Sequence, residues 1–214
     1  MIKEEETEET KSSTPTKKGK LMILTGAGLS APSGLPTFRG KGGLWTDDKL
    51  SRAEYHEEEF DELNGNPMDI VTQATLQENP KLQWNWHLKF FKDLTRCKPN
   101  VAHEAILKLQ EQCQENNIEV MLVTQNVDDY HCQLIKKSRK LDTSAQNSSE
   151  GSVNFAFTPH VVEIHGNFKY MRCNGDCPGF YLAPNHIKAY EKEEDIPRCS
   201  QCGKIMRHHC LFFD

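Results

Sequence analysis

The order of apolar and polar positions along the chain predicts strands that alternate with helices. Residues 21–25 and 118–124 are short, continuous apolar runs, which are typical of buried strands in a parallel sheet. Residues 161–165 predict a third strand. Residues 82–94 and 101–113 instead repeat their apolar side chains at helical spacing. This alternation predicts an α/β fold with a doubly wound, Rossmann-like parallel sheet.

The helical patterns also predict which side chains face the core. One side of residues 82–94 carries Leu82, Trp86, Phe90 and Leu94, and we expect Trp84 and Phe91 to be core residues as well. The inner face of residues 101–113 is predicted to be Ala102, Ile106 and Leu109. A further helix should start near Leu29 and Ser30, and Asp128 is placed to cap one that runs to Lys137.

Three polar segments interrupt this pattern. Residues 1–19 are charged and rich in Ser and Thr, so we expect a disordered tail rather than a signal peptide or a mitochondrial presequence. Residues 41–66 predict a surface loop with a short helix, and residues 138–158 predict a mobile surface loop without a catalytic role. No apolar run approaches the length that spans a bilayer, so we expect no membrane partner.

Composition narrows the possible partners and the compartment. The formal charge of −5 argues against nucleic acid as a main partner, because phosphate binding needs a basic face. Eight cysteines without an export signal favour a reducing, intracellular compartment, where metal binding is more common than disulfides. The basic cluster at residues 17–20 is too short to separate nucleus from cytoplasm.

Four of the cysteines have the spacing of a zinc site. Cys173 and Cys177 form one pair, Cys199 and Cys202 form a second pair, and 21 residues separate the two pairs. Four thiolates in two close pairs suit tetrahedral zinc, and a closed four-thiolate site is structural rather than catalytic. The remaining cysteines are expected to be ordinary buried side chains: Cys97, Cys113, Cys132 and Cys210.

A glycine-rich turn follows the first predicted strand. Residues 26–31 fit the G-x-G-x-x-G/A pattern that brings backbone N–H groups and a helix N-terminus to a phosphate. The alternative is a plain strand-to-helix turn whose glycines serve only positive φ angles. The acidic residue usual about twenty positions later is not evident, because Asp47 and Asp48 lie in a charged loop. The turn therefore predicts a phosphate-bearing cofactor without the pattern of an ordinary dehydrogenase.

The longer string GAGLSAPSGLPTFRG at residues 26–40 resembles the sirtuins, the NAD-dependent protein-lysine deacylases. Residues 124–128, TQNVD, resemble the second signature of that family, and His165-Gly166-Asn167 resembles its catalytic histidine segment. The four cysteines match its zinc module. These signatures occur in the family's order and cover most of residues 21–214.

The resemblance implies roles for the matching positions, with NAD and zinc as cofactors. Gly26, Ala27, Gly28 and Ser30 would surround the phosphates, Phe38 would cover the nicotinamide ribose, Arg39 would reach the phosphates, Gln125 would bind the ribose, and Asn126 and Asp128 would line the nicotinamide pocket. His165 would be the catalytic base and would also contact the cofactor. Asn126 would be a second catalytic residue.

The implied activity is removal of acyl groups from lysine side chains, with transfer to ADP-ribose and release of nicotinamide. The substrate would be an acyl-lysine protein or peptide, and a histone is one candidate. Some members of the family carry a Tyr-x-x-Arg pair for acidic acyl groups, but residues 87–90 read His-Leu-Lys-Phe here. We therefore expect neutral acyl groups, acetyl first. The alternatives are mono-ADP-ribosyl transfer, an impaired zinc- and nucleotide-binding module, and a DNA-binding zinc ribbon disfavoured by the acidic charge.

The resemblance also predicts how the chain is divided. Residues 20–40 and 97–170 would form the Rossmann-like part, 41–96 a small helical part with the cofactor loop, 171–204 the zinc module and 205–214 a terminal strand. The last segment departs from the family, because His208 replaces its usual proline. Since the family continues with the second half of its sheet, we expect an incomplete Rossmann sheet and a sequence that is part of a longer chain.

Overall fold

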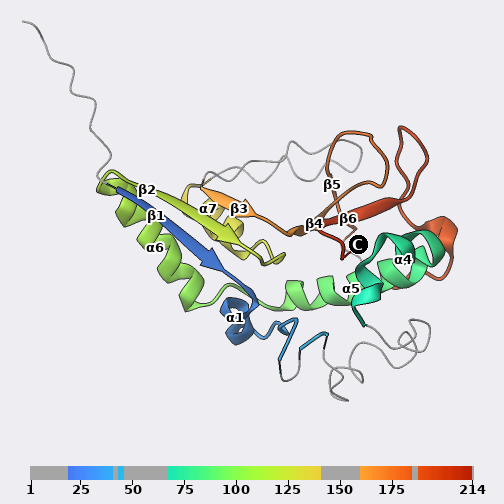
Figure 1. Ribbon diagram of the computed structural model, residues 1–214, viewed down its shortest axis with the longest axis horizontal. Helices are drawn as coiled ribbons and strands as arrows, with labels where there is room; N and C mark the ends of the chain where they lie inside the picture. The colour runs from blue at the N-terminus through green and yellow to red at the C-terminus, as the bar shows by residue number, and fades with distance from the viewer. Residues whose placement is uncertain (1–18, 41–42, 46–66, 141–159, 185–187, 214) are drawn as a thin grey trace, which may run out of the picture.

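A computed structural model describes residues 19–40, 43–45, 67–140, 160–184 and 188–213 (Figure 1). The tail expected at residues 1–19 therefore lies almost entirely outside the described residues. The same holds for most of the loops expected at 41–66 and 138–158.

The first sheet contains three parallel strands in the order β1-β2-β3. They are β1 (Gly19–Thr25), β2 (Ile118–Thr124) and β3 (Val161–Glu163). The register places Leu21 beside Val120 and Leu122 beside Val161. The predicted parallel sheet is confirmed, although the third strand ends at Glu163 and not at His165.

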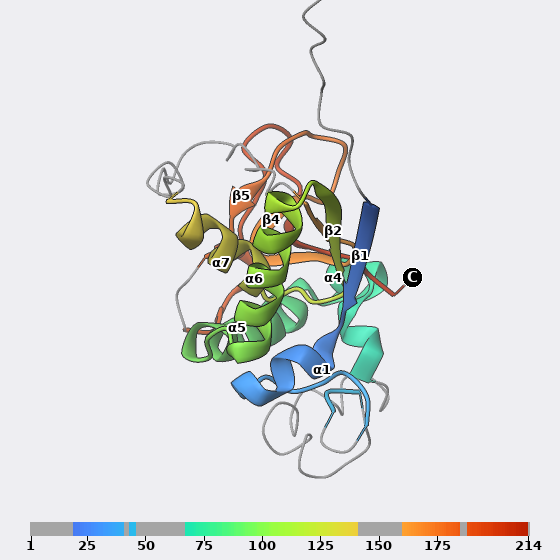
Figure 2. The same ribbon diagram turned by 90° about the vertical axis from the view of Figure 1, so that its left-hand side faces the viewer.

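Two helices, α6 (Val101–Glu115) and α7 (Tyr130–Ser138), cover one face of this sheet (Figure 2). Their apolar side chains pack on Leu122 and Val161. The opposite face carries exposed side chains, with Met22 69% and Leu24 63% exposed. The expectation that these strands are buried on both faces is therefore wrong for the described residues, since their helices cover one side alone.

The inner face of α6 differs in part from the predicted one, because Ile106 packs against the cluster around Leu122 as expected but Leu109 does not. Leu109 is 40% exposed, whereas His103, Gln110 and Cys113 are buried. His103 faces inward instead, and its Nε2 lies 3.4 Å from Ser30 Oγ in the segment that follows β1. A polar side chain with a buried partner thus shifted a face that hydrophobicity alone had assigned.

The second sheet is antiparallel, in the order β5-β4-β6. Its strands are β4 (Gly166–Cys173), β5 (Tyr181–Leu182) and β6 (Met206–Cys210). The Rossmann-like part was predicted to run to residue 170, which is wrong for residues 166–170, because these pair with β5 and β6. The predicted terminal strand joins this sheet too, and it ends at Cys210.

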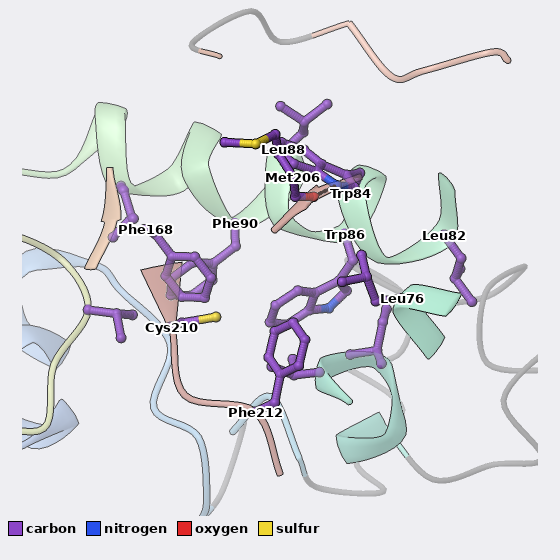
Figure 3. Close-up of a cluster of buried hydrophobic side chains, with 14 of the residues drawn as sticks. Leu76, Leu82, Trp84, Trp86, Leu88, Phe90, Phe168, Met206, Cys210 and Phe212 are labelled. Atoms are coloured by element: carbon purple, nitrogen blue, oxygen red, sulfur yellow. Dashed lines mark hydrogen bonds between the residues drawn. The ribbon is translucent and has the colours of Figure 1, made fainter. Parts of the chain in front are cut away.

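Helices α4 (Gln73–Glu78) and α5 (Pro80–Arg96) pack beside the second sheet (Figures 1 and 3). The Asn79 side chain caps α5 by accepting from the Leu82 amide. The predicted apolar side of α5 is confirmed, since Leu82, Trp86, Phe90 and Leu94 are buried. The Trp84 indole donates to the Met206 carbonyl at 3.0 Å, which fixes α5 to β6.

Several single-turn elements complete the described chain: α1 (Ala27–Ser30), η1 (Ala31–Ser33), η2 (Pro67–Val71) and η4 (Glu193–Asp195). Among the described residues, no helix combines the length and apolarity needed to cross a membrane.

Candidate functional site

A cavity of about 370 Å³ lies where the carboxyl ends of β1 and β2 meet the aromatic core of the second sheet. Seven of the predicted site residues line it: Ala27, Gly28, Phe38, Arg39, Gln125, Asn126 and His165. The segments that follow β1, β2 and β3 therefore bring these side chains to one place, as expected for the carboxyl edge of a parallel sheet. Three predicted residues are not among those that line it: Gly26, Ser30 and Asp128.

The glycine turn leaves room beside its backbone. Gly26 has φ −148°, and Gly28 is not among the residues with positive φ. A β-carbon added to either glycine would meet no atom within 4 Å. The alternative that these glycines serve positive φ angles is therefore wrong. The free space next to Gly28 fits a ligand that approaches the backbone closely, although the single turn of α1 offers less helix dipole than predicted.

Ser30 and Asp128 form a buried polar layer behind the lining residues. The Ser30 hydroxyl donates to Asp128 Oδ2 at 2.6 Å, and Asn126 Nδ2 donates to Ser30 Oγ at 3.1 Å. Asn126 Nδ2 also reaches the Gly26 carbonyl at 3.1 Å. Burial raises the pKa of Asp128, against the hydrogen bond from Ser30. These bonds join the turn after β1 to the turn after β2.

Asp128 was also predicted to cap the following helix. In the structure, one residue occupies the cap position and another makes the capping hydrogen bond. The residue at the cap position of α7 is Asp129, whose side chain makes no capping bond. Asp128 Oδ1 instead accepts from the Tyr130 amide at 3.0 Å. The carboxylate of Asp128 thus satisfies the first turn of the helix from one position earlier.

His103 belongs to the same layer, although it was not among the residues predicted from the sequence. Its Nε2 lies 3.4 Å from Ser30 Oγ, and its Nδ1 accepts from the Asn100 amide at 3.2 Å. With Nδ1 as an acceptor, the ring proton is on Nε2 and faces Ser30. Burial lowers the pKa of His103. The signal in the sequence was the capping box of Asn100 and His103 at the start of a helix.

Two buried polar atoms of the lining residues have no hydrogen-bond partner among the described residues. They are the Asn126 Oδ1 acceptor and the Trp86 Nε1 donor. An unpaired buried polar atom costs about 1–3 kcal/mol. A ligand that offers a donor to the Asn126 amide oxygen would relieve one of these costs. The carboxamide of nicotinamide has such a donor.

His165 lies in the turn between β3 and β4 and lines the cavity. Its Nδ1 is 2.9 Å from the Gln125 carbonyl oxygen, which can only accept, so the ring proton is on Nδ1. Nε2 is therefore left with a lone pair, as a general base requires. The Leu211 amide also donates to the His165 carbonyl at 2.9 Å, which ties the turn to the chain after β6.

Aromatic rings form the apolar wall of the cavity. Phe38 stacks with Trp45 at 5.7 Å between ring centroids, and Trp45 stacks with Trp86 at the same distance. Trp86 was predicted as a core residue, which is confirmed, but it also lines the cavity together with Phe168 and Phe212. Helical periodicity marks a buried side chain and gives no sign that a cavity lies on its other side.

The four predicted zinc ligands are brought together. Their sulfur atoms all lie within 4.8 Å of one another, and Cys173 Sγ is 3.4 Å from Cys202 Sγ. Ligands about 2.3 Å from a tetrahedral zinc ion have this spacing. The Gly175 amide donates to Cys173 Sγ at 3.1 Å.

The pKa values of the thiols in this cluster differ, because each thiol affects the ionisation of its neighbours. Backbone amides of Gln201 and Cys202 lower the pKa of Cys199 to about 7. Hydrogen bonding with the neighbouring Cys202 raises the pKa of Cys177 to about 12. A divalent cation would hold all four as thiolates, so the donor set fits zinc. The closed set of four sulfur ligands would leave no position for catalysis.

Comparisons with known proteins agree with this geometry. The family model described as "Sir2 family" matches residues 26–143 and 133–214. An NAD-dependent protein deacylase of Pyrococcus furiosus is 30% identical over 197 residues, covering 92% of this chain and 62% of the relative. An NAD-dependent protein deacetylase of Caldivirga maquilingensis is 32% identical over 197 residues, covering 90% and 57%.

Solved structures show the same fold. A Sir2 homolog in complex with NAD aligns with a TM-score of 0.58 and 26% identity, covering 92% of this chain and 57% of that one. A variant Sir2 homologue bound to ADP-ribose aligns with a TM-score of 0.59 and 26% identity, covering 92% and 59%. The chain thus spans about three fifths of the length of the relatives it matches. The matched residues, the parallel sheet and the cysteine cluster together show that the chain belongs to the Sir2 family.

Proposed function

We propose that this protein is an NAD-dependent protein-lysine deacylase with acetyl-lysine as its first substrate. The observation that carries the proposal is the convergence of Gly28, Asn126 and His165 on one cavity. These residues offer open space beside a backbone, an unpaired buried amide oxygen and an imidazole with a free lone pair. The family and the names of its relatives support the same reaction.

The residues present fit NAD as the consumed cofactor. Ala27, Gly28 and Arg39 would hold the phosphates, and Gln125 would bind the ribose. Asn126 would accept from the carboxamide of nicotinamide through its Oδ1. The role of Gly26, Ser30 and Asp128 would be indirect, because they do not line the cavity and their hydrogen bonds fix Asn126 and the glycine turn. NAD supplies a glycosidic bond whose cleavage leaves an electron-poor sugar carbon that an acyl oxygen can attack.

His165 would be the general base. The Gln125 carbonyl holds the proton on Nδ1, so Nε2 accepts a proton from a ribose hydroxyl. The aromatic wall of Phe38, Trp45 and Trp86 would exclude water from the reacting carbon and limit simple hydrolysis. The charge that develops during proton transfer would remain on an imidazole held by the Gln125 carbonyl, while the Leu211 amide holds the backbone of the same residue.

The lining favours a neutral acyl group. Arg39 is the one cationic side chain among the described lining residues, and it lies on the exposed loop beside Gly40. His87 is fully buried, and burial lowers its pKa to about 4, so it is neutral at physiological pH. Phe90 is 3% exposed and stacks on Trp86. None of these offers a buried cation to an acidic acyl group.

The zinc site would be structural, and it supports an intracellular location, where thiolates stay reduced. The protein substrate would present an acyl-lysine in an accessible segment. A histone tail is one candidate, and nucleic acid is not a proposed partner.

The test is an assay with NAD and an acetyl-lysine peptide, in which nicotinamide release is measured for the wild-type chain and for His165→Ala. Release that requires the peptide and is lost in the variant supports the proposal. Release that is independent of the peptide would favour ADP-ribosyl transfer or simple hydrolysis. The absence of release from a soluble, zinc-loaded wild-type chain would overturn the proposal.

A further inference from the structure

Asn167 connects three elements around the catalytic turn. Its Nδ2 donates to Glu163 Oε1 at 2.9 Å, at the end of β3, and to Asp129 Oδ1 at 3.0 Å, just before α7. Its Oδ1 accepts from the Lys169 amide at 2.9 Å, within β4. Asn167 is 1% exposed and Asp129 is 4% exposed. A single buried amide thus bridges two carboxyl groups and closes the loop that contains His165.

The backbone of Asp129 adds a second sign of constraint. Asp129 has φ 65°, in the left-handed region that non-glycine residues seldom adopt. Its side chain makes no capping bond at the start of α7 and points instead to Asn167. The conformational cost of such a residue is of the order of 1–3 kcal/mol, which persists only where the surroundings compensate it.

Charge in this cluster is balanced when one carboxyl group holds a proton. The Glu163 and Asp129 oxygens lie within 4.8 Å of each other and of Cys132 Sγ. Lys169 Nζ is 3.6 Å from Asp129 Oδ2 and offsets one negative charge. Burial, followed by the Asp129 charge, raises the pKa of Glu163 to about 7. The groups that face Glu163 are Asp128, Asp129, Cys132 and Lys136 from the α7 side, and Asn167 and Tyr170 from β4.

The turn itself has little freedom to adjust. Gly166 has φ 80°, and a β-carbon there would overlap the His209 backbone. The His165 carbonyl accepts from Leu211, and its ring is held by Gln125. Repulsion between two ionised carboxylates would act on the Glu163–Asn167 bond that spans this turn. Movement of this turn would change the direction of the His165 ring.

We propose that Asn167 is a positioning residue, which holds the His165 turn by bridging Asp129 and Glu163. Ionisation of Glu163 changes this bridge, because the carboxylate attracts the Asn167 amide more strongly and at the same time repels Asp129. This inference rests on the proposed function, since it assigns a role in aiming the general base. Its structural part, the link between the Glu163 proton and the turn, is separable from activity.

The structural part is tested by NMR on the full chain carrying His165→Ala, which removes the titration of the imidazole itself. The Gly166 amide signal should shift with a midpoint near pH 7. The shift should vanish when Glu163→Gln is added, because the amide stays neutral and its oxygen still accepts from Asn167. It should persist when Glu191→Gln, an exposed surface control, is added instead. A missing shift in the parent, or one that survives Glu163→Gln, overturns the proposal.

The positioning role is tested by Asn167→Leu in the otherwise wild-type chain. We expect kcat for nicotinamide release to fall about tenfold, since small misplacements of a catalytic group are costly. The KM for NAD should stay within about twofold, because Asn167 does not line the cavity. A kcat within twofold of wild type overturns the positioning role. If the wild-type chain released no nicotinamide at all, the proposed function would fail, while the NMR result would still decide whether the bridge exists.

Discussion

The ring of His165 is held by the carbonyl oxygen of Gln125, 2.9 Å from its Nδ1. Gln125 follows β2 and His165 follows β3, so adjacent parallel strands place the two residues side by side. This hydrogen bond fixes the tautomer as well as the direction of the ring. The free Nε2 lone pair is thus a consequence of strand order.

His165→Asn separates the positioning of the side chain from its ability to accept a proton. An asparagine amide can still donate to the Gln125 carbonyl, but its oxygen is too weak a base to take a proton. We expect nicotinamide release coupled to acyl transfer to fall at least about 100-fold, as for His165→Ala. Steady-state assays with acetyl-lysine peptide measure this. Activity of His165→Asn near the wild-type level would show that the residue positions and does not accept a proton.

Asn126→Ala tests the unpaired amide oxygen. The change removes the bonds to Gly26 and Ser30 as well as the proposed contact with the carboxamide. The wild-type chain should show a higher melting temperature in NAD, since a ligand that binds the native state stabilises it. The variant should show little or no such increase.

A disturbed glycine turn could also reduce the increase in melting temperature that NAD causes. Ser30→Ala is the matched control for this effect. Ser30 shares the network but does not line the cavity. We expect it to keep most of the melting-temperature increase. If Asn126→Ala responds to NAD as strongly as wild type, the amide oxygen is not a contact.

The cysteine cluster predicts one bound zinc ion per chain. Elemental analysis should find this ratio in wild type and a large loss in Cys199→Ser. Cys113→Ser, at a buried cysteine on α6, should keep the metal. Chelation should also change the near-ultraviolet circular dichroism, because β6 carries the Met206 carbonyl that binds the Trp84 indole. Full metal content in Cys199→Ser would contradict the assignment.

Stability should fall at acid pH because of a buried histidine pair. His87 and His208 stack at 4.1 Å between ring centroids, and both are fully buried. Burial lowers the pKa of His87 to about 4, below the ordinary 6.5 of the unfolded chain. The unfolded state therefore binds more protons as pH falls from 6.5 towards 4, and the native state loses stability over that window. His87 alone accounts for up to about 3 kcal/mol.

Urea unfolding at several pH values measures this dependence. His208→Phe should flatten it, because the phenyl ring keeps the stack and removes one titrating group. An unchanged pH slope in this variant would show that His208 does not contribute.

The acyl preference follows from the apolar cavity. We expect kcat/KM to be higher for acetyl-lysine than for succinyl-lysine peptides, because burying an unpaired carboxylate is costly. Butyryl-lysine should be accepted, since Trp86, Phe168 and Phe212 offer apolar contacts. Faster removal of succinyl than of acetyl groups would overturn this expectation.

The motifs that resemble the sirtuins made the site residues predictable from the sequence. The glycine turn, the Gln125–Asn126 pair and His165 each lie in one of these motifs, and each follows a strand of one parallel sheet, which brings them together. The zinc cysteines were predictable from their spacing alone, which is typical of a tetrahedral zinc site.

Other features depended on contacts between distant segments. Nothing in residues 166–170 shows that β4 leaves the parallel sheet, because its partner is β6, about forty residues later. Trp86 was predicted as a core position of its helix and His103 was not predicted at all, and only the tertiary arrangement places Trp86 on the cavity and His103 behind Ser30. The sequence around Asp129 did not indicate its left-handed backbone conformation or its hydrogen bond to Asn167.

In the proposed reaction, one cavity joins glycosidic cleavage to acyl transfer, with His165 as the base. A mass spectrum of the products formed by the wild-type chain from NAD and an acetyl-lysine peptide tests this coupling. We expect ADP-ribose that carries the acetyl group, together with nicotinamide and free lysine peptide. Unmodified ADP-ribose with an intact acetyl peptide, or ADP-ribose attached to protein, would contradict it.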